Sequence, residues 1–316
     1  MRSKMLSKHH RLDWLKARFH FIRSIRYFFE QRGFIEADCS LASRTRIIEP
    51  YIELVPIWMN GEKGWLYPSP EVGLKKLLSL GIGDVFQISH TFRNGEHGSK
   101  HNSEFTMLEW YRVNMSFQGI IQEAIELVSL FCGKLPHRIV TYTTLFEERF
   151  GINPHTSSLE ELLSLFQKEK LCPYSGLLES SKNDLLNFLM GSHLEKAFPK
   201  DCLTVVTDYP AHQTVMSSLK DVNGYKVAMR FEIYLGDLEL ANGSQEATDA
   251  GRQIEELQAQ HEEYVKRTGE DIRFDFSFLE ALKKLPPCCG VAVGVDRLCM
   301  LGVGSESIHD ILVFPY

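Results

Sequence analysis

The chain has 316 residues, of which 44% are hydrophobic and 24% are charged, and its formal net charge is −6. This composition excludes a disordered, collagen-like or fibrous protein, and it argues against a dedicated nucleic-acid binder, which usually carries a basic excess. No stretch reaches the ~18–20 uninterrupted apolar residues of a membrane span, and no signal peptide is recognisable, so we expect no membrane association. The seven cysteines are odd in number and lack CxxC spacing, which favours reduced thiols in a cytoplasmic protein.

A basic amphipathic helix of roughly twenty residues is predicted near the start, and Gly33 is suited to end it. The apolar residues that recur at spacings of three and four are Leu12, Leu15, Phe19, Ile22, Ile25 and Phe29. The basic residues between them are Arg11, Lys16, Arg18, Arg23 and Arg26. Two interpretations stay open: a core-facing helix with a solvated basic face, or a basic docking surface for an acidic partner.

Short strands joined by turns dominate the next segment. Strand-like patterns occur at residues 34–37, 51–57, 65–67, 84–92 and 105–111. Asn60-Gly61 predicts a hairpin turn, and a helix is expected after it, with Ser69 as its cap and Pro70 in its first position. The charged loop at 93–104 contains no apolar residue, and loops of that length tend to be functional.

Helical patterns dominate residues 145–200, which we interpret as an insertion subdomain. Further strands are predicted at 203–207, 227–234, 238–240 and 289–295, with a turn at 236–237. A long polar helix is predicted at 245–269, and another helix starts at Asp296. The overall expectation is an antiparallel β-sheet flanked by helices, an α+β fold, because strands and helices do not alternate as βαβ units.

Three blocks carry residue types suited to chemistry: 92–111, 239–246 and 290–298. In the first, Arg93 ends a strand, where a guanidinium suits phosphate oxygens, and Phe105 is placed to stack on a planar base. The second holds Glu239 and Glu246 around an expected turn, and Mg²⁺ prefers such carboxylates together with phosphate oxygens. The third places Arg297 where a glycine-rich strand meets a helix. Together they indicate a nucleoside triphosphate site without a Walker loop.

These blocks also resemble a known family. FRN…HNSEFTMLEWYR at 92–112 resembles motif 2 of the class II aminoacyl-tRNA synthetases, and GVAVGVDRL at 290–298 resembles motif 3. ELANGSQE at 239–246 resembles the acidic segment of the lysyl-tRNA synthetase branch. Within that branch the chain is similar to the elongation factor P–(R)-β-lysine ligases, which are lysyl-tRNA synthetase paralogues. SPE at 69–71, TDYP at 207–210 and Ala292 share in this resemblance, which extends to Phe314.

The resemblance implies one class II catalytic domain over 1–316 with a mostly helical insertion at about 145–200, and a homodimer. An anticodon-binding OB-fold is not expected, because about twenty residues before the catalytic domain cannot form a five-stranded barrel. The implied reaction is ATP-dependent activation of (R)-β-lysine or lysine to an aminoacyl-adenylate. Transfer to a lysine ε-amine of elongation factor P would follow.

The resemblance also implies roles for individual residues. The catalytic residues are Arg93 and Arg297. The ATP-binding residues are Arg93, Asn94, Gly95, Glu96, His101, Asn102, Phe105, Glu239, Leu240, Gly294 and Arg297. The substrate-binding residues are Ser69, Pro70, Glu71, Glu109, Tyr111, Glu246 and Ala292. The Mg²⁺ ligands are Glu239 and Glu246.

Two positions depart from the family pattern. Motif 2 normally reads Arg-Asn-Glu, but here Gly95 follows Asn94 and the glutamate is Glu96. Either Glu96 replaces the missing side chain, or the backbone at Gly95 does, or ATP binding is weaker. Ser40 stands where the motif 1 proline is expected. Two other functions are considered: a truncated synthetase-like enzyme that acts on tRNA or makes another amide, and a catalytically silent paralogue that binds a partner.

Overall fold

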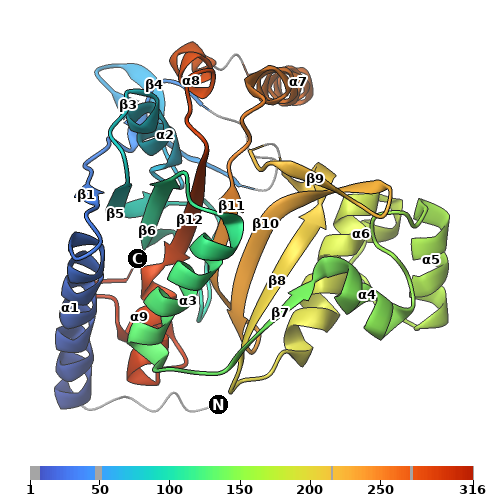
Figure 1. Cartoon of the computed structure of the whole chain (residues 1–316), viewed down its shortest axis with the longest axis horizontal. Helices are drawn as coiled ribbons and strands as arrows, with labels where there is room; N and C mark the ends of the chain where they lie inside the picture. Colours follow the sequence, from blue (N-terminus) through green and yellow to red (C-terminus); the bar gives the residue numbers. More distant parts are fainter. Residues whose placement is uncertain (1–7, 47–51, 215, 271–272, 316) are drawn as a thin grey trace. The chain divides into compact units, whose positions relative to one another are not determined.

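The computed structural model describes residues 8–46, 52–214, 216–270 and 273–315 (Figure 1). The chain divides into two compact units. Unit 1 comprises Met1–Lys134 and Glu246–Tyr316, and unit 2 comprises Leu135–Gln245. Across the described ranges, we find no helix with both the length and the apolar character needed to cross a membrane.

Four neighbouring strands form the sheet of unit 1, in the order β1-β5-β6-β12. They are β1 (Ile35–Glu36), β5 (Val85–Phe92), β6 (Glu104–Val113) and β12 (Cys288–Gly294). Strand β6 runs antiparallel to both β5 and β12, as expected, whereas β1 pairs with β5 in parallel. The expectation of an antiparallel sheet is therefore wrong at this edge. After the turn at Gly33, strand β1 runs in the same direction as β5.

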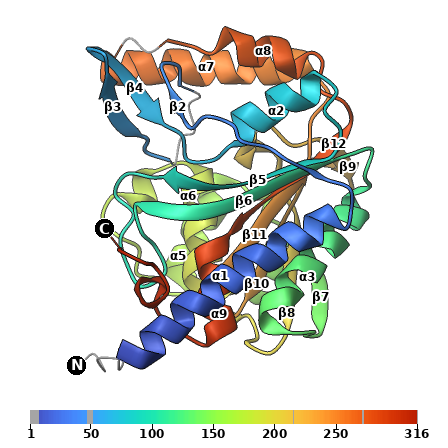
Figure 2. The same ribbon diagram turned by 90° about the vertical axis from the view of Figure 1, so that its left-hand side faces the viewer.

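One face of this sheet is covered by helices α1 (Lys8–Glu30), α3 (Phe117–Cys132) and α9 (Val295–Val303), as Figure 2 shows. Phe86 and Trp110 are paired across β5 and β6 and point to this face. The Phe29 ring of α1 stacks on Phe86 at 4.6 Å between centroids and lies 5.3 Å from Trp110. These aromatic contacts hold the first helix against the sheet.

Helix α1 forms where predicted and ends before Gly33, whose φ is +75°. Its buried side chains are spaced as one helical face and include Arg18, Ile25 and Phe29. Leu12 and Phe19 are instead 52% and 55% exposed. The prediction that these two face the core, and that Arg18 lies on the solvated face, is wrong. A partner for the Arg18 charge, far away in the sequence, makes its burial possible.

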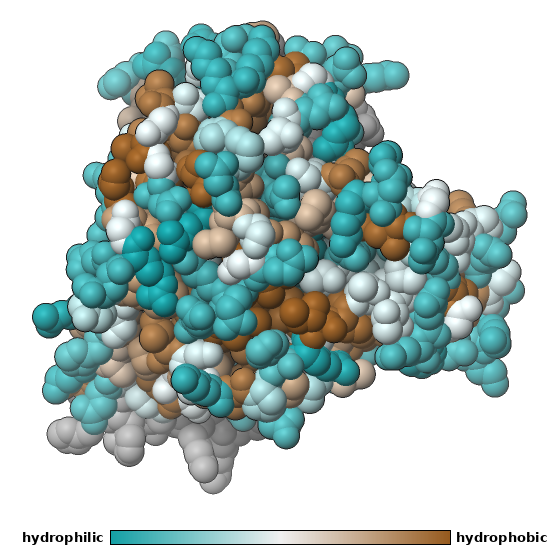
Figure 3. Space-filling model, viewed as in Figure 1, coloured by the Kyte–Doolittle hydropathy of each residue, from teal (hydrophilic) through white to brown (hydrophobic). Residues whose placement is uncertain are grey.

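The described residues of unit 1 also form a three-stranded sheet, three further α-helices and a short helical turn at Ile308–Asp310. The elements are β2 (Ala42–Ser43), β3 (Val55–Met59), β4 (Glu62–Leu66), α2 (Glu71–Ser79), α7 (Ala250–Thr268) and α8 (Phe276–Leu282). The predicted hairpin turn is confirmed, since Asn60 and Gly61 both have positive φ, as a type I′ turn requires. The strand expected at 51–57 begins only at Val55, and Tyr51 lies outside the described residues. The space-filling view is mostly hydrophilic where α7 and α8 lie, at its top (Figure 3).

Two predicted helix starts are wrong, by one residue in α2 and by five in α7. In α2 the N-cap is Pro70, without a side-chain cap, and Glu71 is the first helical residue. Ser69 Oγ accepts the Glu71 N–H at 3.3 Å, so it shapes the turn before the helix. Helix α7 begins at Ala250 and not at 245, because strand β11 continues to Gln245 and the Asp249 side chain caps the helix.

Unit 2 contains the strands β11-β10-β8-β7, with β9 paired to β10. The strands are β7 (His137–Thr141), β8 (Leu203–Pro210), β9 (Leu219–Val222), β10 (Tyr225–Leu235) and β11 (Leu238–Gln245). Strand β10 is antiparallel to β8, β9 and β11, whereas β7 and β8 are parallel, which again departs from the expected antiparallel sheet.

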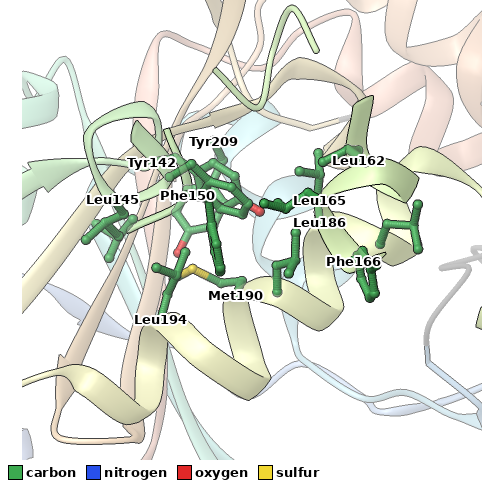
Figure 4. Close-up of a cluster of buried hydrophobic side chains, with 14 of the residues drawn as sticks. Tyr142, Leu145, Phe150, Leu162, Leu165, Phe166, Leu186, Met190, Leu194 and Tyr209 are labelled. Atoms are coloured by element: carbon green, nitrogen blue, oxygen red, sulfur yellow. The ribbon is translucent and has the colours of Figure 1, made fainter. Parts of the chain in front are cut away.

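The helices expected at 145–200 are present: α4 (Tyr142–Phe150), α5 (Leu159–Lys168) and α6 (Lys182–Leu189), with short helical turns at Leu177–Glu179, Met190–Leu194 and Glu195–Ala197. Ser158 and Ser181 begin α5 and α6 with capping boxes. The helices bury a hydrophobic cluster in which Tyr142 and Tyr209 lie together with leucines of α5 and α6 (Figure 4). This cluster gives unit 2 a core of its own.

Candidate active site

The sheet face opposite α1 carries several of the predicted substrate residues. Along β6, alternation directs Phe105, Glu109 and Tyr111 to this face. In the antiparallel register with β12, Ala292 lies opposite Glu109, and Gly290 lies opposite Tyr111. A Cβ atom at Gly290 would be 2.4 Å from the Tyr111 ring, so only glycine leaves room for that ring.

On this face one lysine contacts two carboxylates and a tyrosine bonds a third carboxyl group, and we call Glu71, Lys75, Glu109, Tyr111 and Glu246 the carboxylate cluster. Lys75 Nζ lies 2.5 Å from Glu71 Oε1 and 2.6 Å from Glu246 Oε2. Tyr111 donates its O–H to Glu109 Oε1 at 2.6 Å. Lys75 is fully buried, whereas the side chain of Glu71 is 27% exposed. The structure thus brings four predicted substrate residues together, and Glu71 is the one within reach of solvent.

Burial raises the pKa of Glu109 to about 8, and the negative charge of Glu71 adds to this effect. The hydrogen bond from Tyr111 and the positive charge of Lys75 act in the opposite direction. Burial alone would lower the pKa of Lys75, but the charges of Glu246 and Glu71 outweigh it and the pKa is raised. Near neutral pH, Lys75 is therefore charged, and Glu109 keeps its proton to a higher pH than an ordinary glutamate does. An incoming cation would favour ionisation of Glu109.

Arg93 begins the loop between β5 and β6. Its N–H donates to the Ser103 carbonyl at 2.9 Å, which closes the base of the loop. The guanidinium lies over the Phe105 ring, 5.1 Å from its centroid. Within the described part of the chain, Arg93 Nε and Asn102 Oδ1 are buried without a hydrogen-bond partner. Buried polar atoms left open in this way point to a missing polar ligand.

The next loop residues explain the departure from the motif 2 pattern. Asn94 is held by Glu53, whose Oε1 accepts the Asn94 side-chain amide at 2.9 Å. Gly95 has a φ of +75°, in the left-handed region where a glutamate would be strained. The next residue, Glu96, places its Oε1 3.5 Å from Arg93 Nη1. The conformation therefore favours glycine at 95, and a role for Glu96 in binding ATP stays a prediction.

Arg297 and His101 contact each other at the start of α9. Gly294 is the N-cap of this helix, and Arg297 Nη2 lies 2.6 Å from His101 Nε2. Burial and the positive charge of Arg297 lower the pKa of His101, so the imidazole is neutral and Nε2 accepts from the guanidinium. Ser69 and Pro70 lie in the turn directly before Glu71.

The acidic segment at 239–246 differs from its expected shape. Glu239 and Leu240 lie in the continuous strand β11, so the turn expected between Glu239 and Glu246 is wrong. A bulge at Leu240, which is buried, shifts the register between β10 and β11. Glu239 belongs to unit 2 and Glu246 to unit 1, and their pairing on a metal stays a prediction. Over the described ranges, no group of three His, Cys, Asp or Glu side chains is arranged to hold a metal ion.

A buried carboxyl group of unit 2 forms a different arrangement, and we call Tyr209, Arg230, Glu232, Tyr234 and Asn242 the Glu232 network. Glu232 accepts the Tyr209 O–H at 2.6 Å and the Asn242 side-chain amide at 3.2 Å. It also accepts from Tyr234 and forms an ion pair with Arg230. These four donors satisfy one carboxylate.

Comparison with known proteins agrees with this fold and these motifs. The family model for class II tRNA synthetases (D, K and N) matches residues 2–316. The chain belongs to this class II tRNA synthetase family. The predicted α+β fold of the class II catalytic domain is thereby confirmed.

Similar curated proteins share one name, elongation factor P–(R)-β-lysine ligase. The relative from Avibacterium paragallinarum is 35% identical over 311 residues, covering 96% of this class II synthetase chain and 95% of its own. The relative from Pasteurella multocida is 33% identical over 310 residues, with the same coverage. The relative from Baumannia cicadellinicola is 35% identical over 308 residues, covering 93% of this chain and 92% of its own. The predicted resemblance to these ligases is confirmed.

Sequence reasoning missed Lys75 of the carboxylate cluster, and it missed Asp296, which adjoins the predicted residue Arg297 but is bonded on the α1 side of the sheet. Lys75 follows Glu71 by four positions in α2, on the same helix face as the buried Leu74 and Leu78. A lysine on an apolar face, one turn after a predicted substrate residue, was the available signal. Asp296 precedes Arg297 and is buried at 3% exposure. No pattern in the sequence indicated its partner, which lies in α1.

Proposed function

We propose that the chain is an ATP-dependent, AMP-forming ligase that activates (R)-β-lysine or lysine and transfers it to elongation factor P. The names of the relatives, which align over more than nine-tenths of the chain, support this class of reaction. The carboxylate cluster is the observation that carries the proposal. It concentrates three carboxyl groups on a sheet face, on and around the strand that also bears Phe105.

The cluster suits a substrate with ammonium groups. Glu71 is partly exposed and can accept charge-assisted hydrogen bonds from such a group. Glu109 is buried and its pKa is raised in the ligand-free chain, and a bound cation would favour loss of its proton. Lys75 neutralises part of the remaining negative charge and holds Glu71 and Glu246 in place. The cluster is therefore suited to a cationic amino acid.

The residues around Arg93 fit ATP. Arg93 Nε and Asn102 Oδ1 are buried polar atoms that lack a partner among the described residues. The Phe105 ring offers a surface for stacking, and the guanidinium above it suits a phosphate. When the substrate carboxylate attacks the α-phosphorus, pyrophosphate leaves, and Arg93 would stabilise the negative charge that develops. Roles for His101, Gly294 and Arg297 in holding the nucleotide are part of this proposal.

Mg²⁺ would be held by Glu239 and Glu246 together with phosphate oxygens. Few protein ligands are needed, because Mg²⁺ in nucleotide sites is usually bound by one or two carboxylates plus phosphates. Glu246 contacts Lys75 in this structure, and the carboxylate has the right chemistry for the ion. The ion would offset phosphate charge during activation.

A homodimer is also proposed. Exposed apolar side chains of unit 1 include Leu12 and Phe19 on α1 and Phe314, which is 92% exposed. A groove of about 490 Å³ lies beside Phe19 and Phe314. Its lining combines the apolar Ile22, Leu312 and Val313 with polar residues that include Arg26, His90 and Glu104. Contiguous exposed apolar surface is typical of protein interfaces. A second copy of the chain is the partner that the family resemblance implies.

The decisive experiment measures the intact mass of elongation factor P after incubation with the protein, ATP and either (R)-β-lysine or lysine. In the transfer step the target ε-amine attacks the adenylate carbonyl, an amide forms, and AMP leaves. We expect a mass increase of one lysyl residue that requires ATP and is lost in Arg93→Ala. A parallel reaction with tRNA tests the other acceptor. Labelled tRNA with unmodified elongation factor P would overturn the proposal.

A further inference from the structure

A buried arginine of the first helix bonds two segments that border the proposed ATP site. Arg18 Nη1 lies 2.5 Å from Asp296 Oδ1, and Arg18 Nη2 donates to Thr106 Oγ1 at 2.8 Å. Asp296 Oδ2 accepts the backbone N–H of Thr106 at 2.7 Å. All three residues are less than 5% exposed. We call this closed ring of hydrogen bonds the Arg18 bracket.

Each end of the bracket adjoins a residue expected to contact ATP. Thr106 follows Phe105 in β6, and Asp296 precedes Arg297 in the first turn of α9. The bracket therefore ties the strand that carries the Phe105 ring to the helix turn that carries the Arg297 guanidinium. Figure 2 shows α1 alongside α9 and β6, where the three elements meet.

The chemistry of the bracket is suited to fixing positions. A guanidinium has donors in a rigid planar fork, so it can bind the carboxylate and the hydroxyl in one orientation only. Asp296 also lies in the first turn of α9, where the helix dipole favours a negative charge. An apolar residue at position 18 could be buried on α1 in the way that Ile25 and Phe29 are. Such a residue would form no hydrogen bond with Thr106 or Asp296. Packing alone therefore does not explain an arginine here.

We propose that Arg18 is a positioning residue for the ATP site, which sets the place of Phe105 relative to Arg297 through Thr106 and Asp296. This inference rests on the proposed function, since it assumes that these two side chains hold the adenine. Arg18 touches no substrate itself. Its effect should appear in ATP binding and not in binding of the amino acid, which contacts the carboxylate cluster.

The test compares the double variant Arg18→Met/Asp296→Asn with the parent in ATP–pyrophosphate exchange. The double variant removes both charges, so no charge is left buried without a partner. We expect the KM for ATP to rise at least tenfold, with the KM for the amino acid changed less than twofold. Arg18→Lys, which keeps the charge but not the fork, should give a smaller rise. Equal changes in both KM values, or none, would overturn the proposal.

Arg32→Met is the matched control. Arg32 lies just after α1 and forms an ion pair with Glu126 of α3 at 3.1 Å, so its loss also removes an arginine contact of the same region. Its KM for ATP should equal that of the parent. Calorimetric titration of the parent with ATP separates the two hypotheses. A parent that binds no ATP contradicts the proposed function, whereas a parent and a double variant with equal ATP affinity contradict only the role of Arg18.

Discussion

The carboxylate cluster of unit 1 and the Glu232 network of unit 2 contain similar residue types, but their ratios of hydrogen-bond donors to acceptors differ. In unit 2, one carboxylate receives four donors, including the Arg230 guanidinium and the Tyr209 hydroxyl at 2.6 Å. In unit 1, two carboxylates share one lysine, and a third carboxyl group accepts from one tyrosine. The excess of acceptors raises the pKa of Glu109, after burial itself, through the charge of Glu71.

An arginine of unit 2 and an arginine of unit 1 also differ in how fully their donors are bonded. Arg230 bonds Glu232, donates from Nε to Asn242 Oδ1 at 3.3 Å, and lies over the Tyr209 ring. Arg93 has a buried Nε that lacks a partner within the described chain. The balance of donors and acceptors therefore separates a closed structural network from a site prepared for a ligand. Buried polar groups are normally paired, so an imbalance is informative.

Arg93→Ala should have the largest effect on activity, because it removes the guanidinium that is proposed to bind the α-phosphate. We expect ATP–pyrophosphate exchange to fall by about 10²–10³, equivalent to ~3–4 kcal/mol, by analogy with removal of an oxyanion-hole donor. The circular dichroism spectrum and the unfolding midpoint should stay close to those of the parent. Exchange within threefold of the parent would contradict the role of Arg93.

Glu232→Gln tests the closed network. The change leaves the Arg230 charge without its anionic partner, and we expect the free energy of unfolding to drop by about 3 kcal/mol, the lower end for breaking a buried pair. Urea unfolding measures this effect. The KM for the amino acid should not change. A large rise in KM with unchanged stability would reverse the proposed contrast between the two regions.

Glu71→Gln tests the carboxylate cluster, where we expect a change in substrate binding and not in stability. A charge-assisted hydrogen bond contributes about 1.5–3 kcal/mol, so the KM for lysine or (R)-β-lysine should rise roughly 10–100-fold. The KM for ATP should stay within about twofold. Glu126→Gln, on the exposed surface of α3, is a control that should leave both KM values unchanged. An unaltered KM for the amino acid in Glu71→Gln would mean that the cluster is structural.

Glu109→Gln tests the raised pKa. With a pKa of about 8 in the folded chain against an ordinary value of 4.5, Glu109 binds more protons when folded. Its contribution to stability is therefore present at low pH and is lost as the pH rises from about 5 to 8. Because neighbouring groups titrate with it, we expect a total effect of about 1–2 kcal/mol across this window.

Unfolding free energies of the parent and Glu109→Gln, measured without substrate at pH 5.5 and pH 8, check this prediction. The variant should gain stability relative to the parent at the higher pH. Parallel pH profiles of the two proteins would show that Glu109 is ionised throughout the window.

The smallest effect is expected on α1, where exposed basic residues contrast with the buried Arg18. Lys16 and Arg23 are exposed, and charge reversal of both should slow transfer to elongation factor P several-fold at low salt if this face docks an acidic partner. The defect should shrink as salt rises, because exposed charges are screened over ~8 Å at physiological ionic strength. Adenylate formation should not change. Equal transfer rates at low salt would favour a helix whose basic face is merely solvated.

Local patterns in the sequence were sufficient for most elements and for the motif residues. The spacing of apolar residues predicted α1, and Asn60-Gly61 predicted the β3–β4 turn. Both signals are local, because helix periodicity and turn conformation depend on residues that are close together in the sequence. The strand predicted at 105–111 is present within β6, and its alternation places Phe105, Glu109 and Tyr111 on one face of the sheet. The family motifs indicated the fold class, which the comparison with known proteins confirmed.

The tertiary structure alone decided which charges are buried and what they bind. Arg18 does not differ by local pattern from the exposed basic residues around it, and no local pattern indicates which residue pairs with Lys75. Lys75 meets Glu246 and Arg18 meets Asp296 across more than 150 positions of sequence. The parallel pairing of β1 with β5 is likewise non-local. A charge can be buried only where a partner from elsewhere in the fold compensates its loss of hydration, and that condition exists only once the chain has folded.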